Sequence, residues 1–142
     1  ELINYDAVFV TATDSLAMEY ARKAKILTAT PRVGKSILYK SNIKLDALIG
    51  SGLDPDERID IKKLKITPKI YIATEGEAGG KVIPSGRYIS KKPSSVAIDS
   101  YGCGDSFAGG VTAALGAGWD VEQAISLGAH CGAECTTIFG PY

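Results

Sequence analysis

The stretch Asp99-Ser100-Tyr101-Gly102-Cys103-Gly104-Asp105-Ser106-Phe107-Ala108-Gly109-Gly110 decides the fold of this chain. A short apolar run, Val96-Ala97-Ile98, precedes it, and small residues of helical character follow it to about Ala117. The stretch therefore predicts a strand, a tight glycine turn and a helix whose first amides have no partner within the helix. Such a helix start attracts anions, because the helix dipole adds about half a positive charge there. We predict a phosphate site at this turn.

Asp105 is the unusual residue of the turn, because a carboxylate beside a phosphate site repels the ligand unless it takes part in the chemistry. A general base that removes the proton of an attacking hydroxyl is the chemistry that fits. A glycine turn in which Asp105 caps the helix fits the same residues, and the pattern alone does not separate the two.

Strand and helix patterns alternate upstream of the turn. Compact β-branched and apolar runs predict strands, and helix formers behind a capping residue predict helices. The strands are expected at 7–11, 26–30, 45–49 and 70–74, and the helices at 14–24 and from Asp54 onward. Strands that alternate with helices are typical of a parallel α/β sheet, whose ligands bind at the carboxyl ends of the strands.

Two features complete the pattern. Residues 81–85 and 87–90, separated by Gly86, predict a short antiparallel excursion. A last helix is expected over 121–137, because Asp120 and Gln123 have the spacing of a capping box.

The length and composition predict one soluble domain. The chain has 142 residues, 45% of them hydrophobic, and its 16 Lys and Arg balance its 16 Asp and Glu. A net charge of zero argues against a nucleic-acid or anionic-membrane partner, since either needs a basic excess on one face. No stretch approaches the ~18 consecutive apolar residues of a spanning helix, and the start lacks the pattern of a signal peptide, so we expect a cytoplasmic location.

The cysteines and the ends of the chain give two more expectations. Three cysteines without CxxC spacing are expected to be free thiols. The absence of an initiating Met, and an end just after an apolar run, indicate a piece of a longer protein.

The stretch 99–107 closely resembles the second signature of the ribokinase-like (PfkB) carbohydrate kinases, an Asp-Thr/Ser-x-Gly-Ala-Gly-Asp-Ser/Thr/Ala-Phe pattern. Cys103 departs from it, where the family usually has Ala. Residues 73–79 resemble the family's Thr-x-Gly-x-x-Gly turn, which cradles the nucleotide, and residues 129–133 look like its small-residue helix near the adenine. The resemblance covers Val8 to Pro141 and only the C-terminal half of such a kinase. The family's N-terminal sugar-recognition motif and β lid have no counterpart here.

The resemblance implies a fold and a reaction. The fold is a three-layer α/β/α sandwich with a mostly parallel sheet, incomplete here, in which residues 1–142 form a single C-terminal nucleotide-binding and catalytic portion. The reaction is phosphoryl transfer from ATP, with Mg²⁺, to a hydroxyl of a sugar or related small molecule. Asp105 is then the general base, and the amides of Gly102, Cys103 and Gly104 form the anion hole. Dimers of the family often use the lid, so the intact protein is a candidate homodimer.

The resemblance also implies the remaining site residues. The implied nucleotide contacts are Thr74, Gly76, Gly79 and His130. Ser51 and Asp54 stand at the place of the family's Asn-x-x-Glu motif, which organises magnesium, and they keep its spacing and polar character. Asp99 stands where related kinases build a monovalent-cation site, which makes K⁺ a candidate activator.

Other interpretations of these residues stay open. Asp54 also fits a plain helix cap, His130 fits an ordinary surface histidine, and Cys103 fits either a small buried spacer or a thiol with a lowered pKa. A half-kinase without a sugar site also fits a nucleotide-binding fragment or module that transfers nothing. Asp105 favours the kinase, because a pure binding module has no need for a carboxylate that faces phosphates.

Two other nucleotide motifs are incomplete. Residues 29–36 differ from a Walker A loop at Ala29, where the loop needs glycine, and Pro31 removes an amide from the phosphate cradle. Gly102 and Gly104 suggest a dinucleotide fingerprint, but Phe107 stands where its third glycine belongs. A P-loop ATPase and a dinucleotide-binding enzyme are therefore disfavoured.

Overall fold

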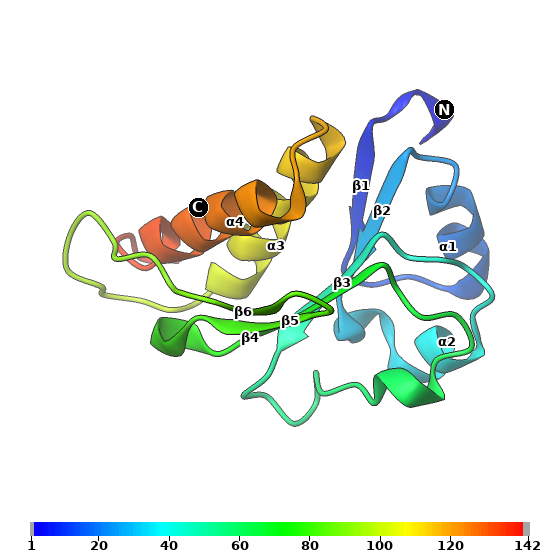
Figure 1. The fold of residues 1–142 in the computed structure, drawn as a ribbon, viewed down its shortest axis with the longest axis horizontal. Helices are drawn as coiled ribbons and strands as arrows, with labels where there is room; N and C mark the ends of the chain where they lie inside the picture. The colour runs from blue at the N-terminus through cyan, green and yellow to red at the C-terminus, as the bar shows by residue number, and fades with distance from the viewer. Residues whose placement is uncertain (1, 141–142) are drawn as a thin grey trace.

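A computed structural model describes residues 2–140, and within them six strands form one sheet (Figure 1). The strands are β1 (Ala7–Val10), β2 (Ile26–Ala29), β3 (Ala47–Ser51), β4 (Ile70–Thr74), β5 (Gly80–Ile83) and β6 (Gly86–Tyr88). They cross the sheet in chain order; β1 to β4 are parallel, and β5 and β6 continue antiparallel. The predicted mostly parallel sheet, with its short antiparallel excursion, is confirmed.

Helices cover both faces of this sheet (Figure 1). The α-helices are α1 (Ser15–Ala21), α2 (Lys35–Lys40), α3 (Cys103–Gly116) and α4 (Val121–Cys135), and short 3-10 turns are η1 (Leu2–Asn4), η2 (Pro31–Val33), η3 (Ile61–Lys63) and η4 (Gly76–Ala78). The capping box of α4 is confirmed, because Asp120 accepts from the amide of Gln123 and the Gln123 side chain accepts in return. In the part of the chain that the structure describes, none of the helices has the length and apolarity needed to cross a bilayer.

The two cores follow from the alternation of side chains along the inner strands. Ala47 and Ile49 of β3 pack with Ile72 of β4 against α3 and α4. Leu48 and Tyr71, their neighbours in sequence, pack on the opposite face with α1 and α2. Strands that are buried on both faces read as continuous apolar runs, which is why β3 and β4 were recognisable in the sequence. The predicted three-layer α/β/α sandwich is confirmed.

Helices α3 and α4 pack with their backbones close together. A Cβ on Gly110 of α3 would lie 3.0 Å from the Cα of Gly128 of α4, and a Cβ on Gly128 would lie 2.7 Å from the carbonyl oxygen of Phe107. These distances leave little room for a side chain at Gly110 and none at Gly128. The close packing fixes the start of α3, which carries the glycine turn, against α4.

Two predicted elements are wrong. Residues 96–98 form no strand, because the amide of Ile98 donates to the carbonyl oxygen of Thr136 at 2.8 Å, which holds the segment beside the end of α4 rather than in the sheet. Asp54 begins a turn and not a helix: its Oδ1 accepts from the amide of Asp56 at 2.8 Å. Such a local bond competes with helix formation. The Walker-like stretch forms η2 and α2, neither of which the sequence pattern predicted.

Candidate functional site

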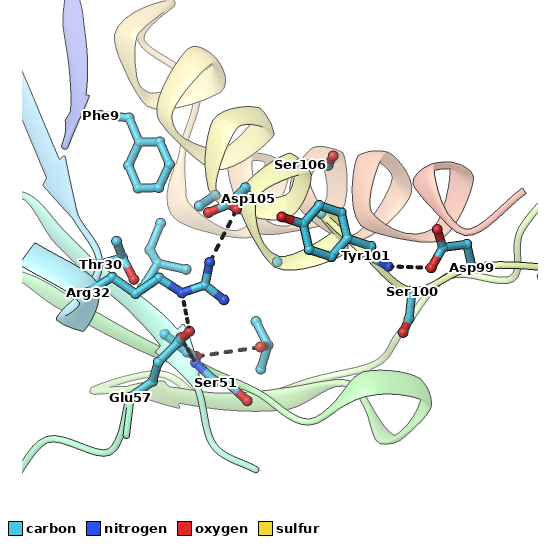
Figure 2. Close-up of a pocket in the computed structure, with 16 residues that line it drawn as sticks. Phe9, Thr30, Arg32, Ser51, Glu57, Asp99, Ser100, Tyr101, Asp105 and Ser106 are labelled. Atoms are coloured by element: carbon cyan, nitrogen blue, oxygen red, sulfur yellow. Dashed lines mark hydrogen bonds and ion pairs between the residues drawn. The ribbon is translucent and has the colours of Figure 1, made fainter. Parts of the chain in front are cut away.

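A cavity of about 720 Å³ lies where the parallel strands end (Figure 2). Thr30 follows β2, and Ser51 and Thr74 end β3 and β4; all three line the cavity. The opposite wall is residues 99–102 and the first turn of α3. The strand ends and the predicted phosphate turn therefore share one cavity.

Backbone geometry makes the glycine turn suitable for an anion. Gly102 is the N-cap of α3 with φ of 83°, the left-handed region that favours glycine. Gly104, in the first turn of α3, lines the cavity, and a Cβ there would meet no atom within 4 Å. The missing side chain thus leaves open space in front of the helix start, where amides lack partners within the helix.

Asp99 fixes this turn to the end of the chain. Its Oδ1 accepts from the amide of Tyr101 and its Oδ2 accepts from the amide of Gly140, both at 2.9 Å. These hydrogen bonds, that of Tyr101 foremost, lower the pKa of Asp99. A carboxylate with both oxygens engaged by backbone amides holds the loop in place before α3.

A line of alternating charges runs across the cavity (Figure 2). The carboxylate of Asp105 lies 3.5 Å from Nη1 of Arg32, whose Nε donates to Oε1 of Glu57 at 2.6 Å. The other oxygen of Glu57 accepts from the amide of Ser51 at 2.8 Å. The hydrogen bond to Glu57, then the charges of Glu57 and Asp105, raise the pKa of Arg32, so the guanidinium stays charged.

Sequence reasoning missed Arg32 and Glu57 as residues of this cavity. Arg32 lies inside the Walker-like stretch, where glycine and proline positions alone decided the interpretation. Glu57 is buried, although nothing in the acidic run of residues 54–57 distinguishes it from its exposed neighbour Asp56. Its burial follows from the turn at Asp54, which sequence patterns predict poorly.

A second cavity, of about 430 Å³, adjoins the first and has mainly apolar walls. Asp99 and Ser100 line both cavities. Tyr88 and Phe107, with ring centroids 5.4 Å apart, stand on one side of it. The walls also include Gly76, Cys103, Ala129, Gly132 and Ala133. Small and aromatic residues of this kind leave a slot that suits a flat ring.

The structure brings most of the predicted site residues to these two cavities. Those that line the first are Ser51, Thr74, Asp99, Gly102, Gly104 and Asp105, and those that line the second include Gly76 and Cys103. Three predicted residues line neither cavity, namely Asp54, Gly79 and His130. His130 is exposed on α4, one residue past Ala129. Gly79 is buried in the turn after β4.

The environment of Cys103 raises the pKa of its thiol rather than lowering it. Burial, helped by the neighbouring thiol of Cys135, raises the pKa of Cys103 to about 11. Of the two interpretations of Cys103, the thiol with a lowered pKa is therefore contradicted, and the small spacer is the one that fits. Cys103 is partly buried at the start of α3, beside Gly102.

The residues of the first cavity fit a magnesium nucleotide better than an all-protein metal site. Among residues 2–140 no cluster of three or more His, Cys, Asp and Glu side chains is arranged to hold a metal ion. Ser51 Oγ already accepts from the amides of Leu53 and Asp54. Magnesium in phosphoryl-transfer sites takes one or two carboxylates together with substrate phosphates and water. Asp105 supplies a carboxylate of that kind on the cavity wall, whereas both oxygens of Glu57 already accept hydrogen bonds, from Arg32 and from the amide of Ser51.

Comparison with known proteins assigns a family. The model of the pfkB family carbohydrate kinases matches residues 36–142. The adenosine kinase of Schizosaccharomyces pombe is 31% identical over 96 residues, which cover 65% of this chain and 27% of that protein. The chain thus spans well under half the length of this curated relative.

Solved structures share the fold. The nucleoside kinase of Methanocaldococcus jannaschii, an archaeal member of the ribokinase family, has a TM-score of 0.75 at 18% identity, over 97% of this chain and 52% of that one. An E. coli structure described as a ribokinase II, in complex with ATP and Mg²⁺, has a TM-score of 0.64 at 19% identity, over 88% of this chain and 48% of that one. The chain corresponds to about half of each.

Proposed function

We propose that this chain, which belongs to the pfkB family of carbohydrate kinases, is the nucleotide-binding and catalytic portion of a kinase. The kinase transfers the γ-phosphoryl group of ATP to a hydroxyl of a small molecule such as a sugar or a nucleoside. One observation carries the proposal: the carboxylate of Asp105 lies in the same cavity as the glycine turn and the strand ends. The S. pombe relative is an adenosine kinase, which keeps a nucleoside among the candidate acceptors.

The two adjoining cavities accommodate the two ends of a nucleotide. The apolar slot beside Tyr88 and Phe107 suits the base, and Gly76 and Ala129 line the same slot. The phosphates then extend past Ser100, which lines both cavities, to the turn before α3. Amides that lack partners within the helix, together with the helix dipole, stabilise negative charge there, and the amide of Cys103 would exchange its 3.4 Å bond to the carbonyl oxygen of Ser100 for the phosphate.

The chemical step divides between Asp105 and the turn. Asp105 accepts the proton of the acceptor hydroxyl as that oxygen attacks the γ-phosphorus, and the amides of Gly102, Cys103 and Gly104 stabilise the developing charge. Bound magnesium supplies further neutralisation of the phosphate charge. Of the two residues expected to hold the metal, Ser51 lines the cavity, whereas Asp54 lines neither cavity and its Oδ1 accepts from the amide of Asp56.

Three finer expectations remain predictions within this proposal. Direct contacts of His130 and Gly79 with the nucleotide are the first, and they require a local rearrangement, because neither residue lines either of the two cavities. Activation by K⁺ requires that Asp99 bind the ion through a carboxylate oxygen that already accepts a hydrogen bond from a backbone amide. A homodimer of the full-length protein is tested by its sedimentation.

The length of the match favours a second candidate function. Because the chain corresponds to about half of the solved relatives, a nucleotide-binding portion that transfers nothing on its own fits the same cavities. Phosphoryl transfer and nucleotide binding are therefore measured separately.

The test compares Asp105→Asn with Asp56→Asn in the full-length protein. ADP release is followed with ATP, Mg²⁺ and a panel of acceptors that includes adenosine, ribose and fructose. We expect Asp105→Asn to lower kcat by about 10²- to 10⁴-fold and to leave ATP affinity nearly unchanged, since loss of a general base affects the chemical step. Asp56, an exposed acid outside both cavities, is the matched control. Wild-type turnover in Asp105→Asn would contradict the role of Asp105 as general base. If the wild-type protein binds ATP but phosphorylates no acceptor, the second candidate, a nucleotide-binding portion that transfers nothing, would be favoured.

A further inference from the structure

Arg32 places a guanidinium on the wall of the 720 Å³ cavity, next to the predicted general base. It comes from η2, in the Walker-like stretch that the proposed function leaves without a role. Its side chain is 59% exposed, and Figure 2 shows it reaching from the strand ends toward Asp105. The guanidinium therefore lies where an acceptor hydroxyl and a γ-phosphoryl group would meet.

The two ion pairs of Arg32 differ in strength. The carboxylate of Glu57 is 9% exposed, accepts from Arg32 Nε at 2.6 Å and is held by the amide of Ser51 through its second oxygen. A short, charge-assisted bond to a buried and fixed partner is a strong one. The contact with Asp105 is 3.5 Å long, and the Asp105 side chain is 51% exposed. Exposed ion pairs are weak, so Arg32 has a fixed anchor in Glu57 and an exchangeable partner in Asp105.

The backbone beneath Arg32 is held in place. Pro31 is buried, and a Cβ on Gly50 of β3 would lie 2.8 Å from its ring. The amide of Val33 donates to the carbonyl oxygen of Thr30 at 3.1 Å, which closes the turn. Only the guanidinium end of Arg32 is therefore free to change partner.

We propose that Arg32 is a phosphate-contacting residue that leaves Asp105 for the transferred phosphoryl group when the nucleotide binds. This inference rests on the proposed function and adds a residue to it. Nη1 and Nη2 donate to γ-phosphoryl oxygens while Nε keeps its bond to Glu57. A guanidinium suits this role because its planar fork matches phosphate oxygens, and the charge of the transition state is spread over those oxygens.

The exchange also frees the general base. With Arg32 on the phosphoryl group, Asp105 accepts the proton of the acceptor hydroxyl. The hydroxyl oxygen forms its bond to the γ-phosphorus as the bond from that phosphorus to the β,γ-bridging oxygen breaks, and ADP leaves with that electron pair. No group beyond ATP and the acceptor is consumed.

The test is the ratio of ATP affinity to ADP affinity, measured by titration calorimetry on the full-length protein with Mg²⁺. Because only ATP carries the γ-phosphoryl group, we expect the wild type to prefer ATP and Arg32→Gln to reduce this preference by at least about tenfold, as loss of a hydrogen bond between charged groups predicts. Arg58→Gln is the matched control. Arg58 is exposed, lines neither cavity and donates to the carbonyl of Gly52, so this variant should keep the wild-type ratio.

Two further variants distinguish phosphate contact from a structural role. Arg32→Lys keeps a charge but loses the fork, and we expect an intermediate ratio. Glu57→Gln alone should lower the ratio of ATP affinity to ADP affinity. In a protein that already carries Arg32→Gln, the same change should have no further effect on the ratio, because Glu57 acts through Arg32. A loss of folding stability with an unchanged ratio would overturn the inference. If Arg32→Gln fails to fold, Arg32→Lys decides, and a wild-type ratio in that variant would overturn it.

The ratio is a binding quantity, so it separates this inference from the proposed function. A protein that prefers ATP through Arg32 but phosphorylates no acceptor would overturn the proposed function and support the inference. A protein that phosphorylates an acceptor while Arg32→Gln keeps both the ratio and the turnover would overturn the inference alone. A wild type without any preference for ATP over ADP would also overturn it.

Discussion

The backbone of Gly79 lies directly against the carbonyl oxygen of Tyr88, so closely that a Cβ on residue 79 would stand 2.1 Å from that oxygen. Gly79 ends the turn after β4, and Tyr88 ends β6. The contact presses the β5–β6 hairpin onto this turn. It thereby sets the position of the Tyr88 ring, which stacks on Phe107 at the edge of the apolar cavity. Gly79 thus shapes the apolar cavity without lining it.

Alanine substitution at the two glycines of this turn tests the contact. Gly76 and Gly79 both have positive φ, 61° and 83°, but only at Gly79 would a Cβ also collide with backbone. We expect Gly76→Ala to lower the free energy of unfolding by about 1 kcal/mol and Gly79→Ala to lower it by about 3 kcal/mol or more. Urea unfolding measures both. Equal losses would show that the Tyr88 carbonyl does not restrict residue 79.

Gly104→Ala should separate folding from binding. A Cβ there meets no atom within 4 Å and projects into the cavity before α3. Alanine raises helix stability by up to about 1 kcal/mol over glycine, so the unfolding midpoint should hold or rise, while ATP affinity falls because the methyl group occupies the phosphate space. Gly109→Ala is the control, since Gly109 lies in the same helix, also has open space, and lines neither cavity. Unchanged ATP binding in Gly104→Ala would contradict the phosphate site.

Asp46 should make the stability depend on acid pH. Burial alone would raise its pKa, but hydrogen bonds from Lys69, the Leu27 amide and Arg22 outweigh burial and lower it. The unfolded chain then binds this proton more tightly than the folded protein does. The stabilisation is present at neutral pH and is lost as the pH falls from about 3.9 through the lower folded value.

Asp46→Asn tests this dependence. It should lower the free energy of unfolding at pH 7 by about 1 to 3 kcal/mol and flatten its fall below about pH 4. Asp6→Asn, which removes an exposed pair with Lys25, should change the stability little. If the free energy of unfolding of Asp46→Asn falls below about pH 4 as steeply as that of the wild type, other carboxylates account for the fall.

The thiol of Cys103 should react slowly with alkylating reagents. Burial, with a further contribution from Cys135, raises its pKa to about 11. At pH 8 the reactive thiolate is then only about a thousandth of the population. We expect iodoacetamide to alkylate Cys103 more slowly than glutathione, with a rate that rises about tenfold per pH unit. Peptide mass spectrometry follows the rate, and rapid alkylation at pH 7 would show that the thiol is not held in this environment.

The elements that sequence predicted are those that local patterns determine. Three of the strands, β2, β3 and β4, stand out because burial on both faces makes them continuous apolar runs, as in residues 70–74. The helix that follows Asp120 stands out because its cap and its glycine boundary are local. Residues 96–98 show the same apolar character but pair with the end of α4, a partner about forty residues away that no local pattern reveals.

The residues of the candidate site also fall into two groups, those that a local sequence pattern reveals and those that only a tertiary contact brings together. The glycine turn and Asp105 were recognisable because their spacing is contiguous in the chain. Arg32 and Glu57 were not, because their importance depends on a contact between two loops that follow different strands. A guanidinium and a carboxylate in separate loops look like surface charges until the strands that carry them are adjacent.

The division of the sheet between its two helical layers has a consequence for the order in which the protein forms during synthesis. Helices α1 and α2 precede β4 in the chain, whereas α3 and α4 come from residues 103–135, after β4. Until α3 and α4 emerge from the ribosome, the face that carries Ile49 and Ile72 lacks the cover of these two helices and is exposed to aggregation. The glycine turn before α3 arrives with the same layer, so a ligand of that turn cannot assist the nascent sheet. Such a ligand can stabilise this layer only once the layer has docked.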